Sequence, residues 1–384
     1  PKPSSAASDV YKRQKKYCIS LLLSLSVLAS CSTLKEYKPT KVVEERSPLT
    51  PLWIKNLDPS YDSGNLPIGL QSPLVHEGIV YAGHNGGYMK AYELENGREI
   101  WSEFDGSAYH AGAVAYKDQV IYGTVQGRVI SRHGILGTIK YSVDLGASVE
   151  TRGVVSNGRV FFQLRNHQVF CLDVETGKIL WGYKRSVPYL TTLQRAGTPV
   201  VYKDKLLVGF ADGTFAALSI EEGVLLYETK LTTASKFVDI DNAPFVLQDR
   251  VYISPVGGAL SLIDPNTGKV LRTSDFTVSR PPLVRDDQLI FGTPNGELLV
   301  TDKNLNLQKT VKVSSGVITS IVPYKTYFAV STTTGELKLV DQKGLNVVET
   351  FKLGHAYSAV FGEMVSTGDN LAVLSSRNRL FLFH

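Results

Sequence analysis

Residues 171–181 read CLDVETGKILW, and this stretch decides the fold. Its first half is an apolar strand that ends in acidic residues, and a Thr-Gly turn follows. Its second half is a strand closed by Trp181. Looser copies occupy residues 91–101 and 217–227, while residues 262–272 keep the turn and lose the Trp. The chain therefore consists of repeated β-hairpins whose turn glycines supply a positive φ.

The repeated unit is roughly 42 residues long. One apolar strand of each unit begins at Ile79, Val120, Val160, Leu206, Val251, Leu289, Tyr327 and Leu371. A period of this length, made only of strands, is typical of a four-stranded propeller blade. Turn pairs such as Asn85-Gly86 and Asn96-Gly97 join the strands, and we expect them to supply the positive φ of the hairpins.

The last unit lacks its fourth strand. Seven repeats are complete, and the eighth, residues 358–384, ends after three strands. Residues 51–58 (PLWIKNLD) match the fourth strands of other units, such as residues 98–101. Pairing this N-terminal strand into the last blade would close the ring and remove a free edge. We therefore predict an all-β, eight-bladed β-propeller of four-stranded blades over residues 49–384.

The first 48 residues read as a leader and a tether. Residues 1–14 match nothing that follows, and we expect them to be extraneous to the natural protein. Residues 15–30 combine two lysines with a short apolar stretch, which is too short to cross a bilayer and is typical of an export signal. Leu28-Ala29-Ser30-Cys31 resembles a bacterial lipobox. We predict a signal peptide over 15–30, a lipidated Cys31 and a flexible tether to residue 48.

The lipobox also implies a location. Ser32 follows Cys31, in place of the Asp associated with retention in the inner membrane. The resemblance therefore implies the outer membrane, with the protein lipid-anchored on its periplasmic face. Several acyl chains on one residue anchor stably, whereas a single chain is marginal.

Composition argues against a disulfide scaffold and against a nucleic-acid partner. The chain has 384 residues and three cysteines: Cys18 in the signal, Cys31 at the lipobox, and Cys171. Cys171 is alone in the mature chain, so no internal disulfide can form, and its apolar neighbours predict a buried residue. The net charge is +5, but five basic residues against Asp9 in residues 1–30 supply four of these charges. No nucleic-acid partner is expected.

The sequence carries no motif for catalysis, for a metal or for a cofactor. It contains no calcium loop of the Asp-x-Asp-x-Asp-Gly type, no adjacent cysteines and no His-Glu-x-x-His spacing. Residues 83–87 (GHNGG) suggest a phosphate loop only superficially, because they form a hairpin turn and open no helix. Trp53, Trp101 and Trp181 are predicted to wedge between blades as core residues. We predict no cofactor, no metal and no catalytic residue.

The repeat resembles that of quinoprotein-type propellers, and the arrangement as a whole resembles the BamB family. This family provides the lipoprotein scaffold of the outer-membrane β-barrel assembly machinery, and the resemblance covers residues 31–384. Residues 237–244 (FVDIDNAP) resemble the family's Asp-Val-Asp-x-x-Pro segment. Residues 189–199 (YLTTLQRAGTP) stand where the family has a Leu-x-Leu-Arg-Gly-type loop. The resemblance implies that these loops dock on the periplasmic POTRA domains of the barrel subunit, BamA.

The predicted partner-binding residues are Leu190, Leu193, Arg195, Asp239 and Asp241. Two carboxylates at i and i+2 of an extended segment lie on one side, roughly 7 Å apart, where a partner's donors could reach them. Leucines beside an arginine form a common hot-spot composition. Two alternatives remain open: the aspartates only cap turns, with Leu193 buried between blades, or they form a general acid–base pair that lacks a nucleophile.

We therefore predict a non-enzymatic scaffold lipoprotein that aids the assembly and insertion of outer-membrane proteins. Its expected partners are the BamA-like barrel subunit, nascent outer-membrane proteins and outer-membrane lipid. The alternative is a periplasmic quinoprotein-like enzyme or a ligand-binding propeller, because quinoprotein dehydrogenases use the same architecture.

Overall fold

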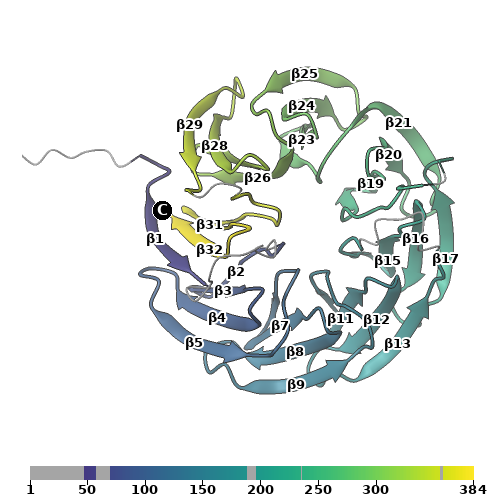
Figure 1. Cartoon of the computed structure of the whole chain (residues 1–384). Helices are drawn as coiled ribbons and strands as arrows, with labels where there is room; N and C mark the ends of the chain where they lie inside the picture. Colours follow the sequence, from purple (N-terminus) through teal and green to yellow (C-terminus); the bar gives the residue numbers. More distant parts are fainter. Residues whose placement is uncertain (1–46, 58–69, 188–195, 235, 355–357) are drawn as a thin grey trace, which may run out of the picture. The chain divides into compact units, whose positions relative to one another are not determined.

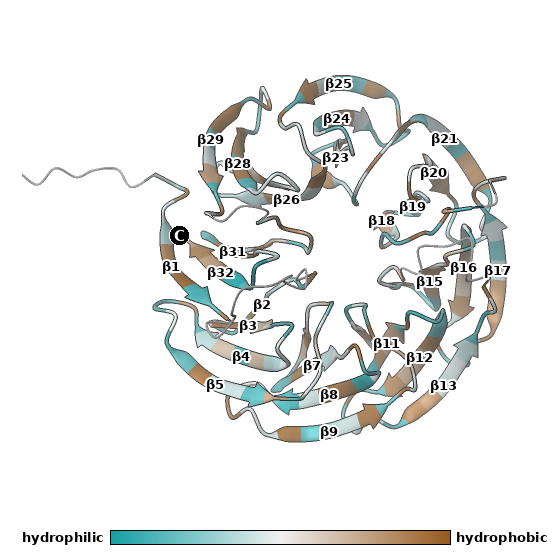
Figure 2. Ribbon diagram, in the orientation of Figure 1, coloured by the Kyte–Doolittle hydropathy of each residue, from teal (hydrophilic) through white to brown (hydrophobic). Residues whose placement is uncertain are grey.

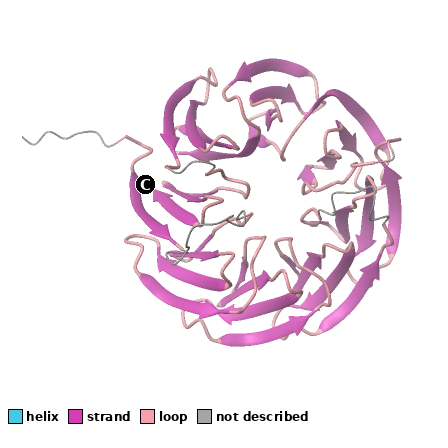
Figure 3. Ribbon diagram, in the orientation of Figure 1, coloured by secondary structure: helices cyan, strands magenta, loops and turns pink. Residues whose placement is uncertain are grey.

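The structure is a computed structural model that describes residues 47–57, 70–187, 196–234, 236–354 and 358–384. The predicted signal peptide, Cys31 and nearly all of the predicted tether lie outside these residues. Within them, every helix-or-strand element is a strand (Figure 3). The described part of the chain has no helix that is long and apolar enough to cross a membrane.

Eight four-stranded antiparallel sheets follow one another around a ring (Figure 1). This arrangement confirms the predicted eight-bladed β-propeller. Blade 1 consists of β2 (Leu74–His76), β3 (Ile79–Gly83), β4 (Tyr88–Glu93) and β5 (Glu99–Phe104). Blade 2 consists of β6 (Val114–Tyr116), β7 (Gln119–Gly123), β8 (Arg128–His133) and β9 (Ile139–Asp144). Blade 3 consists of β10 (Val154–Ser156), β11 (Arg159–Gln163), β12 (Gln168–Asp173) and β13 (Ile179–Lys184).

Four further blades repeat this order. Blade 4 consists of β14 (Val200–Tyr202), β15 (Lys205–Gly209), β16 (Thr214–Ser219) and β17 (Leu225–Lys230). Blade 5 consists of β18 (Phe245–Leu247), β19 (Arg250–Ile253), β20 (Ala259–Ile263) and β21 (Val270–Thr277). Blade 6 consists of β22 (Leu283–Arg285), β23 (Gln288–Gly292), β24 (Glu297–Asp302) and β25 (Leu307–Lys312). Blade 7 consists of β26 (Ile318–Tyr324), β27 (Tyr327–Thr332), β28 (Glu336–Asp341) and β29 (Val347–Lys352).

Blade 8 joins the two ends of the ring. It consists of β30 (Val365–Thr367), β31 (Asn370–Leu374), β32 (Arg379–Phe383) and, as its outermost strand, β1 (Pro51–Asn56). β1 runs antiparallel to β32, with Trp53 opposite Leu382 and Lys55 opposite Leu380. The predicted closure by the N-terminal strand is therefore confirmed.

The hydrophobic core lies between neighbouring blades. Eight clusters of buried side chains each combine residues of two adjacent blades. The second and third strands supply most of them, and several of these strands are coloured hydrophobic in Figure 2. Cys171 is fully buried in one cluster, as predicted. Burial raises the pKa of its thiol to about 12, so the thiolate is scarce near neutral pH.

Aromatic residues in the fourth strands fill the gaps between blades. The Trp53 indole donates a hydrogen bond to the carbonyl of Leu94 in the next blade at 2.8 Å. Trp101 and Trp181 donate in the same way to Gly134 and Ile220, at 2.6 and 3.0 Å. Trp53 and Trp101 are buried and Trp181 is half-buried. All three act in packing between blades, as the sequence predicted.

The turn after each third strand accommodates the aromatic side chain of the preceding blade. A Cβ added at Gly97 would lie 2.7 Å from the Trp53 ring, and one at Gly223 would lie 2.4 Å from the Trp181 ring. Both glycines have a positive φ. Two fourth strands carry Arg272 or Lys309 at the position equivalent to Trp181. In the turns that face them, Leu305 and Leu345 occupy the left-handed position and are buried.

One of the turns between second and third strands, that of blade 1, differs from the prediction. Asn85-Gly86 was expected to supply the positive φ, but φ is positive at Gly87 (+85°). Gly87 donates to the His84 carbonyl at 3.0 Å, and His84 donates to the Tyr88 carbonyl at 3.2 Å. This pattern is a turn followed by one left-handed residue, the common three-residue hairpin loop, so a single position needs glycine.

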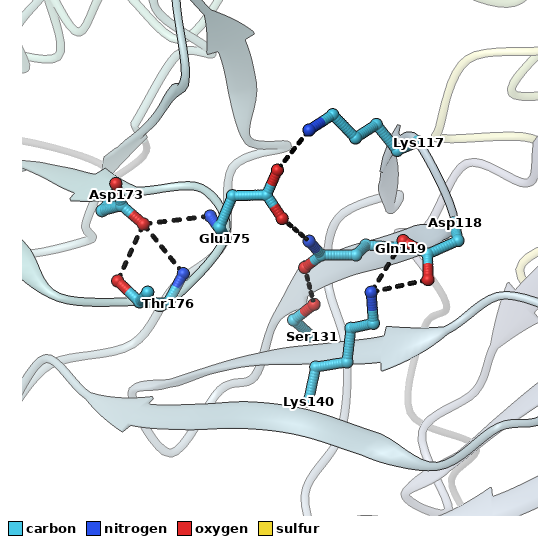
Figure 4. Close-up of polar contacts among 8 residues, drawn as sticks. All are labelled: Lys117, Asp118, Gln119, Ser131, Lys140, Asp173, Glu175 and Thr176. Atoms are coloured by element: carbon cyan, nitrogen blue, oxygen red, sulfur yellow. Dashed lines mark hydrogen bonds and ion pairs between the residues drawn. The ribbon is translucent and has the colours of Figure 1, made fainter.

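Polar contacts tie neighbouring blades together on one face, which we call the clasp face. It carries the turns between first and second strands and between third and fourth strands. Lys117 of blade 2 reaches Glu175 of blade 3 at 2.5 Å, and Gln119 donates to the same carboxylate at 3.0 Å (Figure 4). Arg159 of blade 3 makes a bidentate contact with Glu221 of blade 4.

Candidate functional site

The opposite face of the propeller, which we call the loop face, carries the predicted docking segments. It is made of the links between blades and the turns between second and third strands. Backbone hydrogen bonds join the two kinds of segment, for example from Arg165 to Ser148 at 2.9 Å and from Val256 to Asp239 at 2.8 Å. These two links are thus held in place by turns of neighbouring blades.

Asp239 and Asp241 lie in the link between β17 and β18. Val238 and Ile240 are buried, and Ile240 donates a backbone hydrogen bond to Phe210 at 3.2 Å. Asp239 is itself fully buried, whereas Asp241 is half-buried. The two carboxylates therefore differ in depth, and Asp241 is the more exposed of the two. Leu190, Leu193 and Arg195 lie outside the described residues.

Asp241 lines a cavity of about 650 Å³ at the centre of the loop face. The links that precede the first strands of blades 1 to 6 and of blade 8 contribute to its wall. Apolar residues such as Pro199 and Phe361 alternate there with charged ones. This composition gives the cavity polar anchoring points within an otherwise apolar wall.

A histidine–carboxylate contact and an ion pair connect polar side chains of this cavity. His110 lies 3.4 Å from Glu150. Arg152, in the link before blade 3, lies 3.6 Å from Glu363, in the link before blade 8, so this contact spans the cavity past blades 1 and 2. Burial alone would raise the pKa of Glu150, but its hydrogen bonds with His110 and Ser148 lower it below the ordinary value. Glu150 is therefore charged at neutral pH.

Arg185 forms a second charged cluster where blade 3 leads into blade 4. Its guanidinium donates to the Asp212 carboxylate at 3.0 and 2.8 Å and to Glu228 at 2.6 Å. It also lies over the Phe210 ring, 5.0 Å from the centroid. Burial acts to raise the pKa of Asp212, yet the contacts with Arg185 lower it. The cluster fixes the turn of blade 4 beside the link that holds Asp239.

His167 occupies the left-handed position of the corresponding turn in blade 3, with φ +64°. Only 3% of its surface is exposed, and this burial lowers the pKa of its imidazole. The side chain is therefore neutral at pH 7 and fills space beneath the link.

The cavity and the Arg185 cluster were not predicted from the sequence. Their residues come from links of different blades, and no local spacing connects them. The one available signal was the placement of charged residues at successive strand ends, which the repeat pattern does not distinguish from ordinary solvated turns.

The described residues offer little for a metal or a cofactor. No three His, Cys, Asp or Glu side chains of the described segments come close enough together to hold a metal ion. The tryptophans, which could stack on a cofactor, are used between the blades. The chemistry available on the loop face is that of ion pairs, hydrogen bonds and small apolar contacts.

Comparison with known proteins identifies the family. A protein-family model described as "Outer membrane protein assembly factor BamB" matches residues 85–305, more than half of the chain. The chain belongs to the BamB family. A BamB of Shewanella oneidensis is 22% identical over 392 residues, which cover 95% of this chain and 98% of the relative.

Solved structures agree on the fold. The crystal structure of BamB from Moraxella catarrhalis superposes with a TM-score of 0.74 at 19% identity, over 87% of this chain and 99% of that one. A quinohemoprotein alcohol dehydrogenase from Comamonas testosteroni reaches a TM-score of 0.69 at 12% identity, over 87% of this chain and 76% of the enzyme. The dehydrogenase thus shares the propeller with the BamB family, and this likeness concerns the fold alone.

Proposed function

We propose that this chain is a non-enzymatic scaffold of the outer-membrane β-barrel assembly machinery, which aids the assembly and insertion of outer-membrane proteins. Its loop face would dock on the periplasmic POTRA domains of the BamA-like barrel subunit. Membership of the BamB family carries this proposal. The half-buried Asp241, on a link held by backbone hydrogen bonds, supports the choice of face.

A pull-down with the barrel subunit's periplasmic domains tests the docking face. Asp241→Ala should weaken binding, because a carboxylate desolvated at an interface contributes roughly 2–5 kcal/mol when its partner is left unpaired. Asp369→Ala is the matched control, since Asp369 is an exposed aspartate on the clasp face. Equal loss of affinity in both variants would argue against docking through the loop face.

Asp239 calls for a different expectation. Because it is fully buried, its replacement should lower the stability of the link as well as the affinity. Leu190, Leu193 and Arg195 remain proposed partner-binding residues. Leu193→Ala separates two roles: a surface leucine costs little stability when truncated, whereas a buried one costs about 2–5 kcal/mol.

We also propose that Cys31 carries the lipid and anchors the protein to the periplasmic face of the outer membrane, after removal of residues 15–30. The lipobox resemblance supports this step. Cys31→Ala should leave the protein uncleaved at this site and without its acyl anchor. A Cys31→Ala protein that stays with outer membranes through high-salt washes would contradict lipid anchoring.

The alternative, a quinoprotein-like enzyme or ligand-binding propeller, rests on the shared fold of the quinohemoprotein dehydrogenase. It predicts that the purified protein takes up pyrroloquinoline quinone with calcium. Retention of the quinone absorbance by the protein after gel filtration would favour that alternative over the scaffold.

A further inference from the structure

Phe237 combines exposure with an unfavourable backbone conformation. Among the described residues, the apolar residues other than glycine with a positive φ are Phe237, Leu305 and Leu345. Both leucines are buried, at 2% and 0% exposure, so packing offsets their backbone strain. Phe237 has φ +54° and is 55% exposed. A bulky residue in this region is an outlier, and it receives little compensation from the core.

The equivalent position is glycine in two other links. In the link before blade 3, Arg165 donates to Ser148, as Val256 donates to Asp239 in the link that contains Phe237. The residue two positions before the accepting Ser148 is Gly146 (φ +77°). The residue two positions before the accepting Asp239 is Phe237. The same count in the link before blade 2, where Val125 donates to Ala108, leads to Gly106 (φ +71°).

The geometry of these glycines shows where a side chain at this position points. A Cβ added at Gly146 would meet no atom within 4 Å, and one at Gly106 would meet only the Phe104 ring, at 3.8 Å. The position therefore faces away from the propeller. At this position, where the two other links have glycine, Phe237 places a large apolar ring. It directly precedes the buried Val238 and Asp239.

We propose that Phe237 is an aromatic contact residue of the docking face, inserted into an apolar pocket on a folded partner domain. The inference rests on the proposed function, because it takes the barrel subunit's periplasmic domains as that partner. Rigid aromatic rings are common interface hot spots. Val238 and Ile240, buried on the C-terminal side, fix the backbone of the link beneath the ring. The acidic Asp241, half-buried on the same link, favours a protein over an anionic lipid surface.

Replacing the ring by the residue that the backbone prefers gives a sharp test. The binding of the full mature chain to the barrel subunit's periplasmic domains is measured for wild type, Phe237→Gly and Phe237→Asn, together with urea unfolding. Gly and Asn both tolerate a positive φ. We expect binding to weaken at least about tenfold in both variants, with unfolding midpoints equal to or above that of wild type.

Controls separate the possible failures. Phe104→Ala removes an exposed phenylalanine of blade 1, at 60% exposure, and should leave the affinity unchanged. If wild type itself does not bind, the proposed function fails. If wild type binds and Phe237→Gly binds equally well, or if Phe237→Gly lowers the unfolding midpoint, the assignment of Phe237 is overturned while the docking proposal stands.

A membrane contact is tested separately. Protein without its lipid anchor is mixed with vesicles of phosphatidylethanolamine and phosphatidylglycerol and then sedimented. We expect no co-sedimentation that depends on Phe237. Co-sedimentation of wild type that is lost in Phe237→Gly would overturn the assignment to a protein partner.

Discussion

At the scale of single residues, the size of the fourth-strand side chain in one blade is matched to the size of the residue in the facing turn of the next blade, between its third and fourth strands. Trp53, Trp101 and Trp181 each face a turn glycine. Leu305 and Leu345 stand where the facing strand has Arg272 or Lys309 in place of the aromatic residue. The residue type at the left-handed turn position therefore depends on the side chain of the neighbouring blade as well as on the positive φ, because close-packed interfaces leave little room for a larger side chain.

Gly223→Ala should therefore destabilise the propeller through two effects. The new Cβ would lie 2.4 Å from the Trp181 ring, and the residue would keep φ +71°. The left-handed conformation costs roughly 1–2 kcal/mol and overpacking roughly 1–3 kcal/mol. Gly257→Ala is the control, since φ is +65° and no atom lies within 4 Å. Urea unfolding should show the larger loss for Gly223→Ala, and equal losses would contradict the coupling to Trp181.

Asp105 and Arg132 form a buried ion pair between blades 1 and 2. Their side chains are 3% and 4% exposed, with 2.6 Å between the guanidinium nitrogen and the carboxylate oxygen. Tyr122 and Tyr109 donate to the other carboxylate oxygen at 2.8 and 2.7 Å. Burial raises the pKa of Tyr122 well above its ordinary value, so its hydroxyl remains a donor. If Arg132 is removed, the Asp105 carboxylate keeps its two tyrosine donors but is left buried without this counter-charge.

Arg132→Met should cost roughly 3–5 kcal/mol of the free energy of unfolding, because it leaves the Asp105 carboxylate buried without a counter-charge. The double variant Arg132→Met with Asp105→Asn should lose less than the two single variants added together. Denaturant unfolding of the four proteins gives the coupling free energy. Additivity within about 0.5 kcal/mol would mean that the two side chains act independently.

At the scale of elements, the strands and their turns could be predicted from the sequence and the site could not. Residues 171–181 contain a whole hairpin, so local signals were sufficient to define the repeat. Residues 51–58 revealed the closing strand because they repeat the same fourth-strand pattern. The cavity needs links from seven blades, and the burial of Asp239 depends on Phe210 and Val256 from neighbouring turns. Contacts between residues of different blades produce no regular residue spacing that could be recognised in the sequence.

The Arg185 cluster makes the stability of the blade 4 turn depend on pH. The pKa of Asp212 is lowered in the folded state, so its contribution to stability is present above the unfolded value of about 3.9 and is lost as pH falls below it. Arg185→Gln should cost roughly 1.5–3 kcal/mol at pH 7. The difference between wild type and Arg185→Gln should shrink between pH 5 and pH 3 in urea unfolding, and a constant difference would contradict the pairing.

At the scale of the whole molecule, the two faces of the ring have different roles. On the clasp face, basic side chains such as Arg159 and Lys117 reach the next blade, and such exposed pairs contribute little to stability because water screens them. On the loop face, the links carry the cavity, Asp241 and Phe237. Contacts between blades on both faces keep the links in fixed positions, which is consistent with the proposed docking scaffold.

Ring closure depends on β1, which brings the N-terminal end of the propeller to its C-terminal strand. A chain that begins at Ser47 keeps β1, whereas a chain that begins at Pro59 exposes the edge of β32 and loses the Trp53 side chain from the interface of blades 8 and 1. Loss of a buried Trp alone costs about 3–5 kcal/mol. The shorter chain should therefore have a much lower melting temperature than the longer one.

Trp53→Ala in the longer chain measures the packing contribution alone, and the remaining difference reports the strand pairing. A synthetic peptide of residues 47–58, added in excess to the shorter chain, should raise its melting temperature, because it can pair with β32 and refill the Trp53 site. A peptide with Trp53→Ala should be less effective. If the two chains melt at the same temperature and the peptide has no effect, β1 does not hold the ring closed, and the stability of the propeller must come from the remaining seven interfaces between blades.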